Sequence, residues 1–161
     1  MQRKRIMETD LNYQKYLNYK EQCGRLKKAL QNCFYLEAIF IEYVILEDRS
    51  ESILRYTNKF DALKQKGSDY VSIDRKLKKI SKLAEEKMSI EHLYFREELI
   101  DNLLRWKEER NGIMHALLKR SLTTEVLRSL AEEGMKLVKE FSRVSNNYKR
   151  RLEKMNLLKT I

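Results

Sequence analysis

Apolar residues recur every three or four positions along almost the whole chain, with polar and charged residues between them. This spacing is typical of amphipathic helices, which bury one stripe of side chains and expose the rest. The pattern predicts an all-α fold, a bundle of about five helices joined by short loops. We expect one domain over residues 1–161, because that length suits a single domain and the sequence contains no internal repeat or linker.

Polar and glycine-containing segments divide this pattern into separate helices. A first helix is expected from Asp10 to about Gln22, where Gly24 weakens it, and a second from Arg25 to about Lys59. The remaining predicted elements are a loop over residues 65–72, a helix from Ser72 or Asp74 to near Lys87, a helix from Ile90 to about Glu109 capped by Ser89, a short helix after residue 111, and a last helix over about residues 124–158 begun by Thr123 or Thr124.

The last predicted helix carries an apolar seam in which steps of three and four residues alternate, as in a heptad pattern. The members of this seam are Leu127, Leu130, Gly134, Leu137, Phe141, Val144 and Tyr148. Such a seam packs lengthwise against another helix. The sequence leaves open whether that helix belongs to the same chain or to a second copy.

Charge and composition narrow the class of partner. Thirty-four Lys and Arg against 24 Asp and Glu give a net charge of +10, which attracts polyanions such as nucleic acid and also acidic proteins. A C-terminal basic run is a candidate nucleic-acid contact, although a solvated face is its simpler interpretation. It consists of Lys149, Arg150, Arg151 and Lys154.

Other residue types argue against metal and membrane proteins. Cys23 and Cys33 stand too far apart along one helix for a disulfide, so we expect reduced thiols. Because His92 and His115 are the only histidines, we expect no metal and no cofactor. The longest apolar stretch, residues 38–46, contains a glutamate, and no apolar segment follows the basic N-terminus. A cytoplasmic protein without a membrane segment is therefore expected.

Arg110, Asn111 and His115 bring an arginine, a short polar residue and a histidine together near the end of a predicted helix. On one ideal helix, Arg110 and His115 would be rotated by about 140° and would not share a face. Asn111 and Gly112 predict a break between two helices here, which would bring the two side chains together. A helix N-terminus beside a guanidinium suits a phosphate, and an imidazole can transfer a proton near neutral pH.

An all-α chain with Arg-Asn-x-x-x-His between its later helices resembles the HEPN domain superfamily, and the matching positions are Arg110, Asn111 and His115. The resemblance implies a metal-independent endoribonuclease that acts as a homodimer, with the motifs of two protomers facing each other. It further implies RNA as substrate, a place among toxin–antitoxin or abortive-infection phage-defence systems, and an antitoxin or regulatory protein as a further partner.

Glu42 lies inside the most apolar stretch of the chain, where a carboxylate is costly to bury alone. Either a cation must pair with it or it must face a cleft, and a structural ion pair is the simpler interpretation. HEPN sequences often place acidic or polar residues on an early helix near the motif. By this resemblance, Glu42, Asp48 or Arg49 would orient Arg110 or His115.

Simpler interpretations compete with the catalytic one. Arg110 can complement a helix C-terminus while His115 merely packs. Tyr13, Tyr16 and Tyr19, three residues apart, can stack nucleic-acid bases but more often form a packing edge. Beside the ribonuclease, the alternatives are a non-catalytic HEPN-like module that binds nucleic acid or a protein partner, and a structural adaptor that uses the apolar seam.

Overall fold

The computed structural model describes residues 2–155, and their side chains from residue 13 onward. Every regular element in this part of the chain is helical, which confirms an all-α bundle in a single domain. The elements are α1 (Gln2–Gln31), α2 (Tyr35–Tyr56), the 3-10 turn η1 (Asp61–Leu63), α3 (Ile73–Ala84), α4 (Ile90–Tyr94), α5 (Glu97–Ala116) and α6 (Thr124–Lys154). None of these helices is long and apolar enough to cross a membrane.

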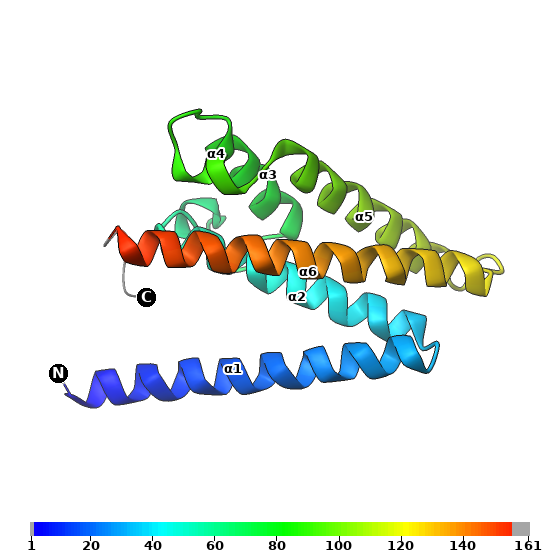
Figure 1. Cartoon of the computed structure of the whole chain (residues 1–161). Coiled ribbons are helices and arrows are strands. Elements are labelled where there is room, and N and C mark those ends of the chain that lie inside the picture. The colour runs from blue at the N-terminus through cyan, green and yellow to red at the C-terminus, as the bar shows by residue number, and fades with distance from the viewer. Residues whose placement is uncertain (1, 156–161) are drawn as a thin grey trace.

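Helix α2 is the central element, in contact with α1, α3 and α6 (Figure 1). Its neighbour α6 runs parallel to it, because Glu42 lies against Gly134 and Arg49 Nη1 donates a hydrogen bond to Asn146 Oδ1 further along both helices. Helix α1 runs antiparallel to α2, as Figure 1 shows. The apolar seam of α6 therefore packs within the chain, mainly against α2.

Aromatic side chains fill the centre of the core. Phe95 follows α4 and packs edge-on against Phe141 and Tyr148 of α6, with ring centroids 6.3 and 5.0 Å apart. Edge-to-face pairs of this kind contribute about 0.5–1.5 kcal/mol each beyond the area they bury. The buried Trp106 of α5 donates its Nε1 hydrogen to the Leu130 carbonyl oxygen at 2.9 Å, which fixes α5 on α6.

Three predicted helix starts are confirmed by their caps. The side chains of Ser72, Ser89 and Thr123 each accept a hydrogen bond from the backbone N–H three residues later, at 3.4, 3.0 and 3.4 Å. These bonds satisfy N–H groups that the first turn of a helix leaves free. The predicted start of the last helix is thus correct. Helix α6 ends at Lys154, and the final residues of the predicted range, 156–158, lie outside the described part of the chain.

Two predicted boundaries are wrong at the N-terminal end. Helix α1 already includes Asp10 and passes through Gly24 to Gln31, because Leu26 and Ala29 beyond the glycine are buried against the core. The chain reverses instead at Cys33, which adopts a φ of +59°. The Phe34 N–H then donates to the Ala29 carbonyl oxygen at 2.8 Å and closes the helix end.

The predicted helix from Ile90 to Glu109 is also corrected, because it divides into α4 and α5 between Tyr94 and Glu97. Phe95 leaves helical geometry there, with φ −104° and ψ 82°, and its ring enters the core. The burial of this ring explains why the helix is interrupted at a position where the sequence contains neither glycine nor proline.

Candidate functional site

The Arg110–His115 segment lies on one continuous helix, so the predicted break at Asn111 and Gly112 is wrong. Helix α5 extends to Ala116, and both Ile113 and Ala116 are buried. Asn and Gly each reduce helix stability by less than about 1 kcal/mol relative to Ala. Burying one isoleucine side chain contributes about 1.5–3 kcal/mol, which is enough to keep this turn helical.

Arg110 is held between a tyrosine ring and the neighbouring asparagine. Its guanidinium carbon lies 4.4 Å from the centroid of the Tyr43 ring on α2, a cation–π contact. Arg110 Nη1 donates a hydrogen bond to Asn111 Oδ1 at 3.1 Å. Arg110 Nε is buried and has no partner within the described chain. The guanidinium is thus fixed in place while part of its hydrogen-bonding capacity is unused.

His115 lies on a different side of α5 from Arg110. Five residues along a continuous helix correspond to a rotation of about 140°, and the His115 side chain is exposed. Asn111 is four residues before His115 and shares its face. The structure therefore brings Arg110 into contact with Asn111, places His115 one turn beyond Asn111, and does not bring Arg110 and His115 together within one chain.

Several charged and phenolic groups surround the Tyr43 hydroxyl. Burial raises its pKa, nearby Glu47 and Tyr70 raise it further, and Arg110 and Lys107 act in the opposite direction. These groups come from α2, from α5 and from the turn before α3. The side of α2 that carries Tyr43 is consequently a meeting point of three segments and includes the Arg110 guanidinium.

Glu42 is fully buried but forms no ion pair with any side chain that the structure describes, so the predicted structural ion pair is not found there. Its carboxyl lies against Gly134 and near Trp106, and neither oxygen has a hydrogen-bond partner in the described part of the chain. Burial raises the pKa of Glu42 to about 9, so its carboxyl is protonated at neutral pH. Neutralisation by a proton takes the place of the expected cation.

Asp48 and Arg49 face away from Arg110 and join other helices to α2. Asp48 Oδ1 pairs with Lys15 Nζ at 2.8 Å, and Arg49 Nε donates to the Tyr19 hydroxyl at 2.7 Å. Along α2 these residues are rotated by about 140° and 120° in opposite senses from Tyr43. Their predicted role of orienting Arg110 or His115 has no contact to support it within the described side chains.

The C-terminal basic run lies at the far end of α6 from the Arg110 region. Gly134 is beside Trp106, one turn before Arg110, and residue 150 is about 24 Å further along the helix axis. Lys149 Nζ lies 5.8 Å from the Tyr56 ring centroid and 3.8 Å from Glu153 Oε1, whereas the other three members are exposed. The run and the motif are thus two separate surfaces of one chain.

Tyr43 and Tyr70 are the residues at this site that sequence reasoning missed. Tyr43 follows Glu42 directly, and its only sequence signal is its place inside the apolar stretch, residues 38–46. For three tyrosines of α1 a packing edge is the simpler expectation and base stacking the alternative. Tyr19 is held by Arg49, whereas Tyr13 and Tyr16 are exposed.

The described residues contain no group of three or more His, Cys, Asp or Glu side chains placed to hold a metal ion. Cys23 and Cys33 are both free thiols, the first half-buried and the second exposed. No protein-family model, curated protein or solved structure matches this chain.

Proposed function

We propose that this chain is a metal-independent endoribonuclease of the HEPN type, acting as a homodimer. The observation that carries the proposal is the fixed Arg110 guanidinium, held by Tyr43 and by Asn111, which lies one helical turn before the exposed His115. An immobilised, partly exposed arginine suits a phosphate diester, because its planar fork matches two phosphate oxygens.

The proposed reaction is an internal attack within RNA. The 2′-hydroxyl oxygen forms a bond to the adjacent phosphorus, and the bond from phosphorus to the 5′-oxygen of the next nucleotide breaks. Arg110 stabilises the negative charge on the phosphate oxygens in the transition state. His115 transfers a proton at the attacking or the leaving oxygen, and Asn111 keeps the guanidinium oriented. The products are a 2′,3′-cyclic phosphate and a 5′-hydroxyl.

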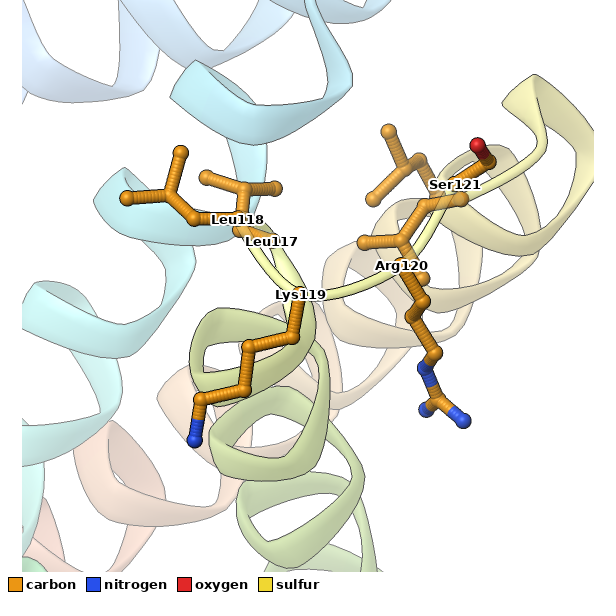
Figure 2. A pocket seen from close by; sticks show the side chains of 7 residues that line it. Leu117, Leu118, Lys119, Arg120 and Ser121 are labelled. Atoms are coloured by element: carbon orange, nitrogen blue, oxygen red, sulfur yellow. The ribbon is translucent and has the colours of Figure 1, made fainter.

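A second protomer completes this site, because His115 and Arg110 diverge on one helix. An exposed apolar surface beside the motif supports such pairing. Leu36, Phe40 and Val44 form an exposed stripe on α2, opposite the side that packs on α6, and Phe40 is 60% exposed. At the end of α5, Leu117 and Leu118 extend from the turn on the side away from Lys119 and Arg120 (Figure 2). We call these five hydrophobic residues the α2–α5 apolar surface.

The test is cleavage of a total cellular RNA pool in the presence of EDTA, with single-stranded DNA of mixed sequence as the negative control. Arg110→Ala is expected to abolish cleavage, and His115→Ala to slow it by about two to four orders of magnitude. Arg143→Ala, which removes an exposed arginine on α6, is the matched control and should cleave at the rate of the unmodified protein. Cleavage that requires Mg²⁺, or that survives both motif substitutions, would overturn the catalytic proposal.

The alternative is a non-catalytic HEPN-like module that binds nucleic acid or a protein. The divergence of Arg110 and His115 on a continuous α5 favours this alternative if the chain is a monomer in solution. RNA binding that depends on Arg110, without cleavage, would support it. With either function, the net charge of +10 suits an acidic antitoxin or regulatory protein as a further partner, and an RNA substrate suits a cytoplasmic location.

A further inference from the structure

The turn that precedes α3 presents an exposed tyrosine in an ordered frame. Tyr70 is 65% exposed, although its neighbour Val71 is buried in the core. Gly67 has a φ of +83° and allows a tight reversal, in which the Ser68 N–H donates to the Gln65 carbonyl oxygen at 3.0 Å. The Tyr70 N–H donates to Ser68 Oγ at 3.2 Å. The backbone that carries this aromatic ring is therefore well fixed.

Lys64 and Asp74 attach the two ends of this turn to their surroundings. Lys64 Nζ pairs with Asp61 and Asp69 at 3.0 and 3.1 Å. Asp74, in the first turn of α3, accepts a hydrogen bond from Lys107 Nζ of α5 at 3.0 Å. Lys107 is three residues before Arg110 and therefore on nearly the same side of α5. The turn is thus anchored beside the segment that carries the motif.

Tyr70 consequently lies near the ring on which Arg110 rests. Its hydroxyl is close enough to that of Tyr43 to contribute to the raised pKa of Tyr43. Two of the charges near Tyr43 are already paired, since Glu47 accepts from Lys76 at 3.4 Å and Lys107 is paired with Asp74. Arg110 is partly exposed, although its Nε is buried without a partner in the described chain. An exposed aromatic ring and a partly exposed guanidinium therefore lie at the same junction, where the turn before α3 meets α2 and α5.

We propose that Tyr70 is a stacking platform for an unpaired base of single-stranded RNA whose phosphate lies on Arg110. This inference rests on the proposed function and adds the form of its substrate. Aromatic side chains bind bases through ring faces, and every base has such a face, so the contact tolerates different sequences. In a duplex both faces of an internal base are covered by its neighbours, so this platform selects unpaired segments.

The experiment measures binding separately from cleavage. The probe is a fluorescent 2′-O-methyl RNA single strand of about ten nucleotides, which has no free 2′-hydroxyl to attack the phosphate, and the readout is fluorescence anisotropy at low salt. Tyr70→Ala is expected to weaken binding about 5- to 100-fold, the range that loss of one stacked base produces. Tyr70→Phe keeps the ring and should bind within about twofold of the unmodified protein.

The matched control is Phe34→Ala, because Phe34 is an aromatic residue that is 58% exposed at the start of α2, close to the exposure of Tyr70. This variant should bind the probe like the unmodified protein, and Tyr70→Ala should not change the affinity for duplex 2′-O-methyl RNA. Equal affinity of Tyr70→Ala and the unmodified chain, an equal loss in Phe34→Ala, or no binding at all would overturn the inference. Dissociation of a dimer by Tyr70→Ala would also overturn it and assign Tyr70 to a protein interface.

The outcomes separate this inference from the proposed function. Normal cleavage of RNA in EDTA combined with unchanged binding by Tyr70→Ala refutes only the stacking platform. Binding that depends on Tyr70 without any cleavage refutes only the catalytic role of Arg110 and His115.

Discussion

Replacing Glu42 by glutamine should make the protein more stable, and increasingly so as the pH rises. The Glu42 carboxyl is fully buried against Gly134, has no partner in the described chain, and has a pKa raised from 4.5 to about 9. Glutamine has nearly the same shape and stays neutral at every pH. The difference between the two proteins therefore reports the cost of keeping one carboxyl protonated.

The sign and size of this effect follow from proton linkage. In the unfolded chain Glu42 loses its proton above about pH 4.5, whereas the folded chain keeps it until about pH 9. Between these values the unfolded state binds fewer protons, so the stability of the unmodified protein relative to the glutamine variant falls as pH rises. The fall is about 1.4 kcal/mol for each pH unit. From about pH 5 to about pH 8 the gap should widen by about 3–4 kcal/mol.

The assay is urea unfolding at fixed ionic strength and fixed protein concentration, at several pH values across this interval. Comparing variants at each pH removes the contributions of the other titrating groups, which both proteins share. Glu140→Gln, on the exposed side of α6, removes the same formal charge and is the control; its difference from the unmodified protein should stay within about 0.5 kcal/mol. A constant gap for Glu42→Gln across the interval would refute the buried neutral carboxyl.

Further predictions concern packing, association and charge. Gly134→Ala should destabilise the protein by about 2–4 kcal/mol in thermal or urea unfolding, because the new methyl group would overlap the Glu42 carboxyl and lie 2.8 Å from Trp106 Cζ2. Gly24→Ala is the control, because a methyl group added there has no atom within 4 Å; it should stabilise the protein by up to about 1 kcal/mol. Phe40→Glu, in the α2–α5 apolar surface, should convert the proposed dimer to a monomer, as measured by light scattering at tens of micromolar. Leu93→Glu on α4 is the control and should remain a dimer. If Phe40→Glu also remains a dimer, the α2–α5 apolar surface is not the dimer interface. Neutralising the four residues of the C-terminal basic run should make RNA binding less sensitive to salt. The slope of the logarithm of the binding constant against the logarithm of salt concentration should fall in magnitude by up to about 3. An unchanged slope would mean that the run is a solvated face that does not contact RNA.

Features encoded by neighbouring residues were predictable from the sequence. The caps at Ser72, Ser89 and Thr123 each depend on one side chain and on the backbone N–H three residues later. A Ser or Thr directly before an apolar run is therefore enough to predict a helix start. The seam of α6 depends on helical spacing alone, and Leu130 and Phe141 are indeed buried.

Features that depend on tertiary contacts were not predictable in this way. Glycine at residue 24 is a plausible helix end, yet the burial of Leu26 and Ala29 outweighs its low helix propensity. Conversely, nothing local marks Cys33 as the left-handed residue that closes α1, because that conformation usually belongs to Gly or Asn.

The candidate site shows the same division. Arg110, Asn111 and His115 were identified from their spacing, and the contact between Arg110 and Asn111 involves adjacent residues. The continuity of α5 depends on where Ile113 is buried, and the support from Tyr43 crosses between helices that are distant in sequence. A single sequence carries no record of such long-range pairs, so neither the helix continuity nor the aromatic support was found.

The parallel pairing of α2 with α6 has a consequence for how the chain folds as it is synthesised. The hydrogen bond between Arg49 and Asn146 joins residues 97 positions apart. Closing a loop of this length costs about 4 kcal/mol in chain entropy, which local contacts do not recover in advance. At synthesis rates of about 5–20 residues per second, roughly 5–20 seconds separate the appearance of α2 from that of its covering helix. During that interval only α1 and, once it is synthesised, α3 can shield the apolar side chains of α2. The side of α2 that packs on α6 stays uncovered, so a nascent chain that stalls before Thr124 is prone to aggregate and depends on chaperones.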